Sequence, residues 1–239
     1  MAVGVCVPVH NEENRLSFAL EALSLAFRKL PRAEVVTSLA IVLDDCSDRS
    51  EAIARNFARH GSHVATKVLT SSARSVGAAR QMGCLSLMRT FGSFDLSRIW
   101  LATTDADSEV PPDWLVHQLD CRQRNVAFWA GRVSVADWSD RAEQTAQLWR
   151  DAYFDESAPV HGANIGIDAR LFQQVGGFPP LPTGEDKALE RAVLRAGAPI
   201  CHDWRASVKT SARVRGRAPL GFAHYLDSLE TCDIRRAPV

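Results

Sequence analysis

The hydrophobic pattern of the first 125 residues alternates short apolar runs with stretches of helical periodicity. The run "VGVCVPV" at 3–9 predicts a buried strand. The apolar residues that follow recur on one helical face, at Leu16, Leu20, Leu23, Phe27 and Leu30. We expect Asn11 to cap this helix, with Glu12 and Glu13 favourable in its first turn.

The same cycle repeats along the first half of the chain. Further strands are predicted at 39–43, 64–69 and 98–104, and further helices from about Ser47, from about Ser75 and after Pro112. Strands that alternate with helices favour an α/β fold, with a Rossmann-like, mostly parallel sheet and helices on both of its faces.

From about Val126 the alternation loosens. Residues 125–135 read as a strand, 139–155 as a helix, and the Gly/Pro-rich segment 176–186 as a loop that leads into a helix from about Glu185. No linker, repeat or low-complexity tract interrupts this half. We therefore expect a single domain over 1–239, with halves at 1–125 and 126–239.

Composition excludes several classes of protein. The chain of 239 residues carries 28 basic and 28 acidic residues, so its formal charge of zero provides no general surface for nucleic acid. Six cysteines without a C-x-x-C pair predict buried thiols in a reducing compartment and no structural zinc. No apolar stretch reaches the roughly 18 residues of a membrane span, and no basic segment precedes the first strand, so we expect a cytoplasmic protein.

Three of the predicted strands end in polar residues, "PVHNEE", "DDCSD" and "TTDAD". Ligands of open α/β sheets bind beyond the carboxyl ends of the strands, so these three segments should meet at one crevice. No G-x-G-x-x-G or Walker lysine loop follows the first strand, which argues against dinucleotide and P-loop sites.

Asp105 and Asp107 lie two positions apart after an apolar run. Side chains at i and i+2 leave a strand on the same face, and Mg²⁺ or Mn²⁺ is often held by one or two carboxylates with substrate phosphates and waters. The same pattern is common in turns and helix caps, so the pair alone leaves both interpretations open.

Five blocks in order carry a more specific signal: "VPVHNEE", "IVLDDCSDRS", "TTDADSEVPPDWL", "HGANIGIDARLFQQVGGF" and "GEDKALERAVLRAGAPI". Together, over roughly residues 3–204, they resemble the family 2 glycosyltransferases, which have the GT-A fold. The resemblance implies a nucleotide-sugar donor, UDP- or GDP-linked, a divalent metal, Mn²⁺ or Mg²⁺, and inversion at the anomeric carbon. It also makes 1–125 the nucleotide-binding half and 126–239 the acceptor-binding half.

The resemblance assigns donor contacts in the first half. Pro8, His10 and Glu12 match the family's P-x-x-N-E segment, where Pro8 and His10 would line the nucleobase and ribose. His10 stands where a tyrosine is more usual, and an imidazole also stacks on a base. Asp45 matches the carboxylate that accepts a hydrogen bond from the base, a contact that can select one base over another.

Further matches concern the diphosphate and the metal. Arg80 matches an arginine that would contact donor phosphates, although pairing with a neighbouring carboxylate is an equal alternative. Gln81 departs from the family's asparagine. Asp107 corresponds to the metal-coordinating aspartate, and Asp105 to a residue that faces the ribose or a metal-bound water.

In the second half, Asp186 of "GED" matches the family's general base. Such a base removes the proton of the acceptor hydroxyl, whereas acidic residues that only complement a helix dipole are a common alternative. Gly162 and Asn164 are expected near the donor sugar or the acceptor.

The C-terminal segment concentrates Lys209, Arg213, Arg215 and Arg217. Arg213 or Arg217 would close over the diphosphate, and a solvated basic loop or a peripheral contact with anionic lipid are the alternatives. The Gln-x-x-Arg-Trp motif of processive synthases is absent, which favours a single transfer, of hexosyltransferase type, to a discrete acceptor. A nucleotidyltransferase and a catalytically silent nucleotide-binding protein remain as other readings.

Overall fold

The computed structural model describes residues 1–61, 63–135, 137–139, 141, 143–155, 160–211 and 226–227. Its centre is a seven-stranded sheet with the order β3-β2-β1-β4-β6-β5-β7. The strands are β1 (Ala2–Val9), β2 (Val36–Asp44), β3 (Ala65–Ser71), β4 (Ile99–Thr103), β5 (Phe128–Val135), β6 (Ile165–Asp168) and β7 (Ile200–Thr210). Only β6 runs antiparallel to its neighbours, which confirms the mostly parallel sheet.

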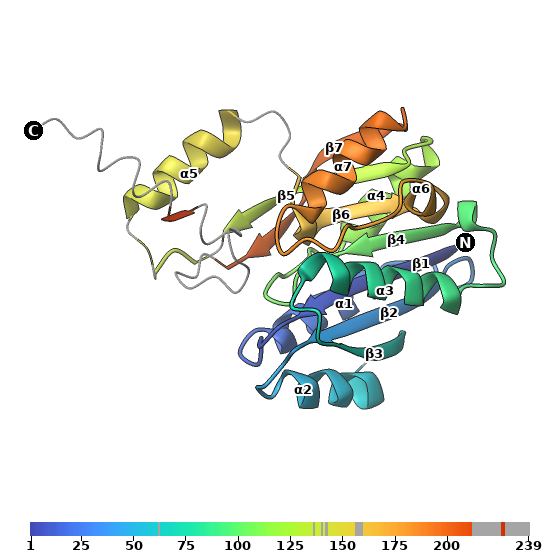
Figure 1. Cartoon of the computed structure of the whole chain (residues 1–239), viewed down its shortest axis with the longest axis horizontal. Helices are drawn as coiled ribbons and strands as arrows, with labels where there is room; N and C mark the ends of the chain where they lie inside the picture. The colour runs from blue at the N-terminus through green and yellow to red at the C-terminus, as the bar shows by residue number, and fades with distance from the viewer. Residues whose placement is uncertain are drawn as a thin grey trace, which may run out of the picture.

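Helices cover both faces of the sheet (Figure 1). They are α1 (Leu16–Arg28), α2 (Ser50–Asn56), α3 (Val76–Thr90), α4 (Trp114–Gln123), α5 (Glu143–Asp155), α6 (Ala169–Gln174) and α7 (Glu185–Arg195), with short π or 3-10 segments η1 (Phe57–Gly61), η2 (Leu96–Arg98) and η3 (Gly162–Asn164). Helices α1, α2 and α4 pack on one face, and α3, α6 and α7 pack on the other. Within the described residues, none of the helices combines the length and the hydrophobicity of a membrane span.

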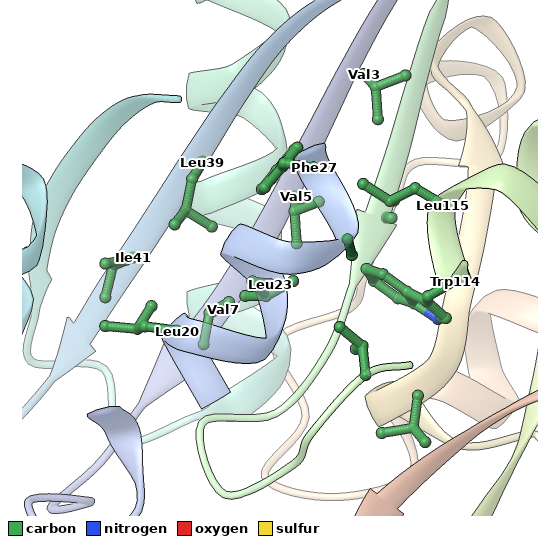
Figure 2. Packing of buried hydrophobic residues seen from close by; sticks show 14 of the residues in the cluster. Val3, Val5, Val7, Leu20, Leu23, Phe27, Leu39, Ile41, Trp114 and Leu115 are labelled. Carbon is green, nitrogen blue, oxygen red and sulfur yellow. The ribbon is translucent and has the colours of Figure 1, made fainter. Parts of the chain in front are cut away.

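Alternating residues of the central strands contribute to the two cores on either face of the sheet. Val3, Val5 and Val7 of β1 belong to the core under α1, and Figure 2 shows Val5 and Val7 beside Leu20 and Leu23 of that helix. Ala2 and Cys6, at the alternate positions, belong to the core under α3. A strand buried on both faces reads as a continuous apolar run, which explains "VGVCVPV".

The chain order reverses at β1. Strands β2 and β3 are added on one side of β1, and β4 pairs with its other side. Such a switch point separates the loops that leave two adjacent strands, and it opens a crevice at their carboxyl ends. The polar segments after β1 and β4 therefore lie at this crevice. The arrowheads of β4, β5 and β7 point to the same side in Figure 1.

Two local predictions are wrong. Asn11 does not cap α1, because a turn at Glu12 delays the helix to Leu16. Asn11 instead has φ 54° and accepts a hydrogen bond from the Ser47 amide at 2.7 Å, which ties the loop after β1 to the loop after β2.

Asp105 and Asp107 likewise do not extend a strand. Strand β4 ends at Thr103, and the amide of Ser108 donates to the carbonyl of Asp105 at 3.2 Å to close a turn. The rule that places i and i+2 on one strand face does not apply to this pair.

Candidate active site

The loop after β1 is fastened to the end of β2. Nδ1 of His10 donates to the carbonyl oxygen of Asp44 at 2.7 Å. The buried carboxylate of Asp44 accepts from the amides of Arg74 and Ser75, at 3.1 and 2.9 Å. Asp44, which the sequence did not single out, thus orders the loop that leads into α3. Pro8 is half-buried at the end of β1.

Asp45 and Glu12 lie next to the residues that join these two loops, because Asp45 follows Asp44 and Glu12 is two residues after His10. Asp45 has φ 52° and pairs with the exposed Arg74 guanidinium, while its own side chain stays 36% exposed. A carboxylate with this exposure is accessible to a nucleobase. Glu12 is buried, and its amide donates to the Ser50 hydroxyl at 2.8 Å. The donor contacts of Pro8, His10, Glu12 and Asp45 stay predictions.

Arg80 joins the two halves of the chain. Its side chain is 3% exposed, and its two terminal nitrogens donate to Asp105 and to Glu185. Phe178 lies under the guanidinium, with 5.9 Å from Cζ to the ring centroid. Of the two alternatives for Arg80, the structure shows the carboxylate pairing.

The charges of this cluster depend on one another. Loss of hydration raises the pKa of Asp105 and of Glu185, and the Arg80 guanidinium opposes this in both. Burial also disfavours the charged form of Arg80, yet Asp105 and Glu185 together raise its pKa. The three groups therefore form one network, in which removal of Arg80 would leave the buried Glu185 without its ion-pair partner.

Asp107 lies two residues after Asp105, in the turn that follows β4. Its Oδ1 accepts a hydrogen bond from the Ser108 hydroxyl at 3.3 Å, and its charge raises the pKa of Asp105. The loop is held to β7 by a pair of backbone hydrogen bonds between Glu109 and Lys209, at 2.8 and 3.0 Å.

These carboxylates suit a hard cation that takes its remaining ligands from a substrate and from water. Among the described residues, no three His, Cys, Asp or Glu side chains gather as a ready metal cluster. Mg²⁺ is commonly bound by one or two carboxylates with phosphates and waters completing the shell. Asp107, with the free oxygen of Asp105, is such a partial set.

Asp186 lies at the start of α7. Its Oδ2 accepts from the amide of Gly162 at 2.9 Å, so it contacts the η3 segment that precedes β6. Gly184, just before the helix, has φ +76°, a left-handed conformation that favours glycine. Gly162 also needs its small size, because a Cβ there would collide with the Arg80 guanidinium. The two glycines allow Asp186 to approach the Arg80 network.

The hydrogen bonds of the Asn164 side chain go to the fold itself, and its expected contact with the donor sugar or the acceptor stays a prediction. Asn164 is fully buried, and Nδ2 donates to the carbonyls of Arg132 and Ala206 at 2.6 and 2.9 Å. Its Oδ1 accepts from the indole of Trp114 at 2.6 Å. Both amide hydrogens are thus used to join β5 and β7, so Asn164 acts in this structure as a brace under the site.

Glu185 is a site residue that sequence reasoning treated only as helix-terminal charge. The signal was present, because Glu185, Leu189 and Val193 share the i, i+4, i+8 spacing of the buried stripe of α7. A charged residue on a buried stripe requires a partner, and Arg80 is that partner.

The basic C-terminal residues are only partly placed. Lys209 is exposed on β7, whereas Arg213, Arg215 and Arg217 lie outside the described residues.

His161, next to Gly162, makes the stability of this region sensitive to acid. Burial lowers the pKa of His161 to about 4 from 6.5, with Lys187 acting in the same direction and Asp186 opposing it. Below pH 6.5 the unfolded chain therefore binds a proton that the folded protein resists, and stability falls as the pH drops from 6.5 toward 4. The imidazole is partly exposed, so the loss is at most about 3 kcal/mol.

In His161→Gln the position no longer titrates. Urea unfolding measured between pH 7.5 and 4.5 should show a smaller loss of stability in this variant than in the wild type. Equal losses in the two proteins would contradict the burial of His161 as the cause.

Fold and site together define a class: an open α/β sheet with a polar crevice at its switch point, and carboxylates from both halves of the chain around one buried arginine. The model of glycosyl transferase family 2 matches residues 4–167, more than half of the chain, and the chain belongs to this family. A search of curated proteins finds no match.

Solved structures with the GT-A fold are similar to most or all of the chain. S. aureus TarS 1-349 in complex with UDP-GlcNAc has a TM-score of 0.66 at 14% identity, over 100% of this chain and 68% of that one. The mannosyltransferase PcManGT from Pyrobaculum calidifontis, with GDP-Man and Mn²⁺, has 0.64 at 16%, over 99% and 65%. GalNAc-T7 with UDP, GalNAc and Mn²⁺ has 0.60 at 15%, over 89% and 44%. At these identities the likeness shows the fold, which confirms the GT-A expectation.

Proposed function

We propose that the protein transfers one sugar from a nucleoside diphosphate sugar to a hydroxyl of a discrete acceptor, with inversion and with the aid of Mn²⁺ or Mg²⁺. The donor is UDP- or GDP-linked, and the transfer is of the hexosyltransferase type and non-processive. Membership of glycosyl transferase family 2 supports the reaction class. The UDP-GlcNAc of the TarS complex and the GDP-Man and Mn²⁺ of the PcManGT complex support the donor and the metal.

One observation carries the proposal: buried Arg80 pairs with Asp105 from the loop after β4 and with Glu185 from the start of α7. Asp107 follows the first of these partners by two residues, and Asp186 follows the second directly. Because their neighbours share one buried cation, we assign Asp107 to the metal and Asp186 to proton removal. An inverting transfer requires this division, because the acceptor attacks opposite the leaving group.

Each residue then has a distinct task. Asp45 would accept a hydrogen bond from the base, and His10 would stack on it. Asp107, with Asp105, would hold the metal, which when bound supplies Lewis-acid stabilisation of the departing diphosphate. Asp186 would accept the proton of the acceptor hydroxyl, a role that typically contributes about 10²- to 10⁴-fold in rate. Arg80 and Glu185 would keep Asp105 and Asp186 in position.

Thermal unfolding with UDP, GDP, CDP, dTDP and ADP, each with and without Mn²⁺, tests the binding part of the proposal. Native-state binding at about 100 times the dissociation constant stabilises by near 2.7 kcal/mol. We expect a metal-dependent shift with UDP or GDP and none in Asp107→Ala, whose fold should stay intact. Asp113→Ala removes an exposed carboxylate from the same connection and should behave as wild type.

Turnover separates the proposal from its rivals. Release of the nucleoside diphosphate from a donor sugar in the presence of acceptor supports transfer, whereas release of pyrophosphate from a nucleoside triphosphate would show a nucleotidyltransferase. A metal-dependent shift that persists in Asp107→Ala would refute the metal assignment.

A further inference from the structure

Trp204 is the exposed tryptophan of the edge strand β7. It is 58% exposed, whereas Trp100, Trp114 and Trp129 are completely buried. A single exposed apolar side chain is ordinary on a protein surface. Trp204 differs from such a side chain in its contact with a buried arginine.

The indole of Trp204 is stacked on a buried arginine. Arg132 of β5 is 8% exposed, and its Cζ lies 3.4 Å from the centroid of the Trp204 ring. At this distance the guanidinium covers one ring face and fixes the indole by a cation–π contact. The exposed area of Trp204 therefore belongs mainly to the opposite face, a flat and preorganised apolar surface turned to solvent.

This surface lies level with Asp186. Helix α7 leads by four residues, 196–199, into β7, so the two elements run in opposite directions. Nε2 of His202 lies 3.5 Å from Oε1 of Glu190, which sets their register. Asp186 is one turn before Glu190 on the same side of the helix, a displacement of about 6 Å. Trp204 is two residues further along β7, where its pairing with β5 shifts register. Because Ala130 pairs with His202 and Arg132, two residues after Ala130, stacks on Trp204, the indole lies on the same face as His202.

Trp204 is also remote from the donor contacts. Pro8 is the last but one residue of β1 and Asp45 follows β2, and strands β4, β6 and β5 separate β1 from β7. A group bound on the indole therefore approaches Asp186 from the side away from the nucleotide.

We propose that Trp204 is the stacking platform for a pyranose ring of the acceptor, so that the acceptor is a saccharide or glycoside. This inference rests on the proposed function of Asp186. A pyranose has a face of C–H groups that complements the electron-rich face of an indole, and its hydroxyls project from the rim of the ring. Stacking on Trp204 leaves a rim hydroxyl directed at Asp186. Arg132 is a positioning residue, because it orients the indole without contacting the sugar.

The binding test needs no turnover. The indole N–H signal of Trp204 is assigned in a ¹H–¹⁵N spectrum by its loss in Trp204→Phe, and the wild-type protein is titrated with methyl glycosides of glucose, galactose, mannose and N-acetylglucosamine. We expect at least one glycoside to shift the Trp204 signal and leave the buried indoles unchanged. No shift with any glycoside, or a shift with UDP or GDP and Mn²⁺ alone, would overturn the inference.

Kinetics then test the assignment to the acceptor. With a glycoside that binds, Trp204→Ala should raise the acceptor KM by about tenfold and leave the donor KM unchanged, and Trp204→Phe should recover part of the loss. Phe18→Ala removes an aromatic side chain of similar exposure from α1 and serves as the matched control. An increase in the donor KM instead would sink the acceptor role.

The two proposals fail separately. Metal-dependent nucleotide binding with no response of Trp204 to glycosides leaves the proposed function standing and removes the platform. Glycoside binding at Trp204 without any nucleotide binding removes the proposed transfer, and with it the reading of the sugar as an acceptor.

Discussion

Asp186→Asn is expected to lower kcat for sugar transfer by at least about 100-fold while the donor affinity stays close to that of the wild type. Asparagine keeps an oxygen that can accept from the Gly162 amide, so the 2.9 Å contact to η3 is retained. It cannot accept the proton of an acceptor hydroxyl. The loss should therefore appear in the chemical step.

The measurement is nucleoside diphosphate release at saturating donor and acceptor, with donor binding followed by thermal shift in the same samples. Glu190→Gln makes the same charge change one turn further along α7 and should keep most of the activity. If Asp186→Asn turns over at a near-normal rate, the proton is removed by another group and the assignment of the base is wrong.

Arg80→Leu should reduce the free energy of unfolding by about 3 to 5 kcal/mol, because it leaves Asp105 and Glu185 without their buried cation. The arginine is 3% exposed and Glu185 is 4% exposed, so water cannot replace the lost partner without opening the site. Denaturant unfolding followed by circular dichroism measures the change.

An exposed ion pair provides the control for Arg80. Arg55 pairs with Glu51 within α2, where both side chains are about half exposed, so Arg55→Leu should cost at most about 1 kcal/mol. The double variant Arg80→Leu with Glu185→Leu should lose less than the sum of the two single variants. Equal effects of Arg80→Leu and Arg55→Leu would show that the Arg80 network adds no stability.

Sequence patterns predicted the order of the elements well in the first half. Leu16, Leu20 and Leu23 recur at helical spacing, and they do bury one face of α1. The predicted start of that helix was wrong. Asn11 is a residue type that often caps helices, but its side chain accepts a hydrogen bond from the Ser47 amide in another loop. A local rule cannot see a partner 36 residues away. The apolar runs predicted the strands for the same reason that they pack, as continuous or alternating buried surface.

The candidate site was predictable in its parts but not in its arrangement. The acidic residues Asp105, Asp107 and Asp186 stand out in the sequence because charge beside an apolar strand or at a helix start is chemically conspicuous. Asn164 stands out equally, yet the structure uses its amide to join β5, β7 and Trp114. Whether a polar side chain faces a ligand or braces the fold depends on what surrounds it.

By itself the sequence determined the α/β class, the polar strand ends and the family resemblance, because these depend on periodicity and on short ordered motifs. Only the tertiary structure decided that Arg80 pairs with Asp105 and Glu185, and that Trp204 stacks on Arg132 beside α7. Those pairs join residues 25, 105 and 72 positions apart, a relation that arises when separate elements pack at one edge of the sheet. Once such residues are buried, each charged group requires a partner, because an unpaired charge is costly away from water.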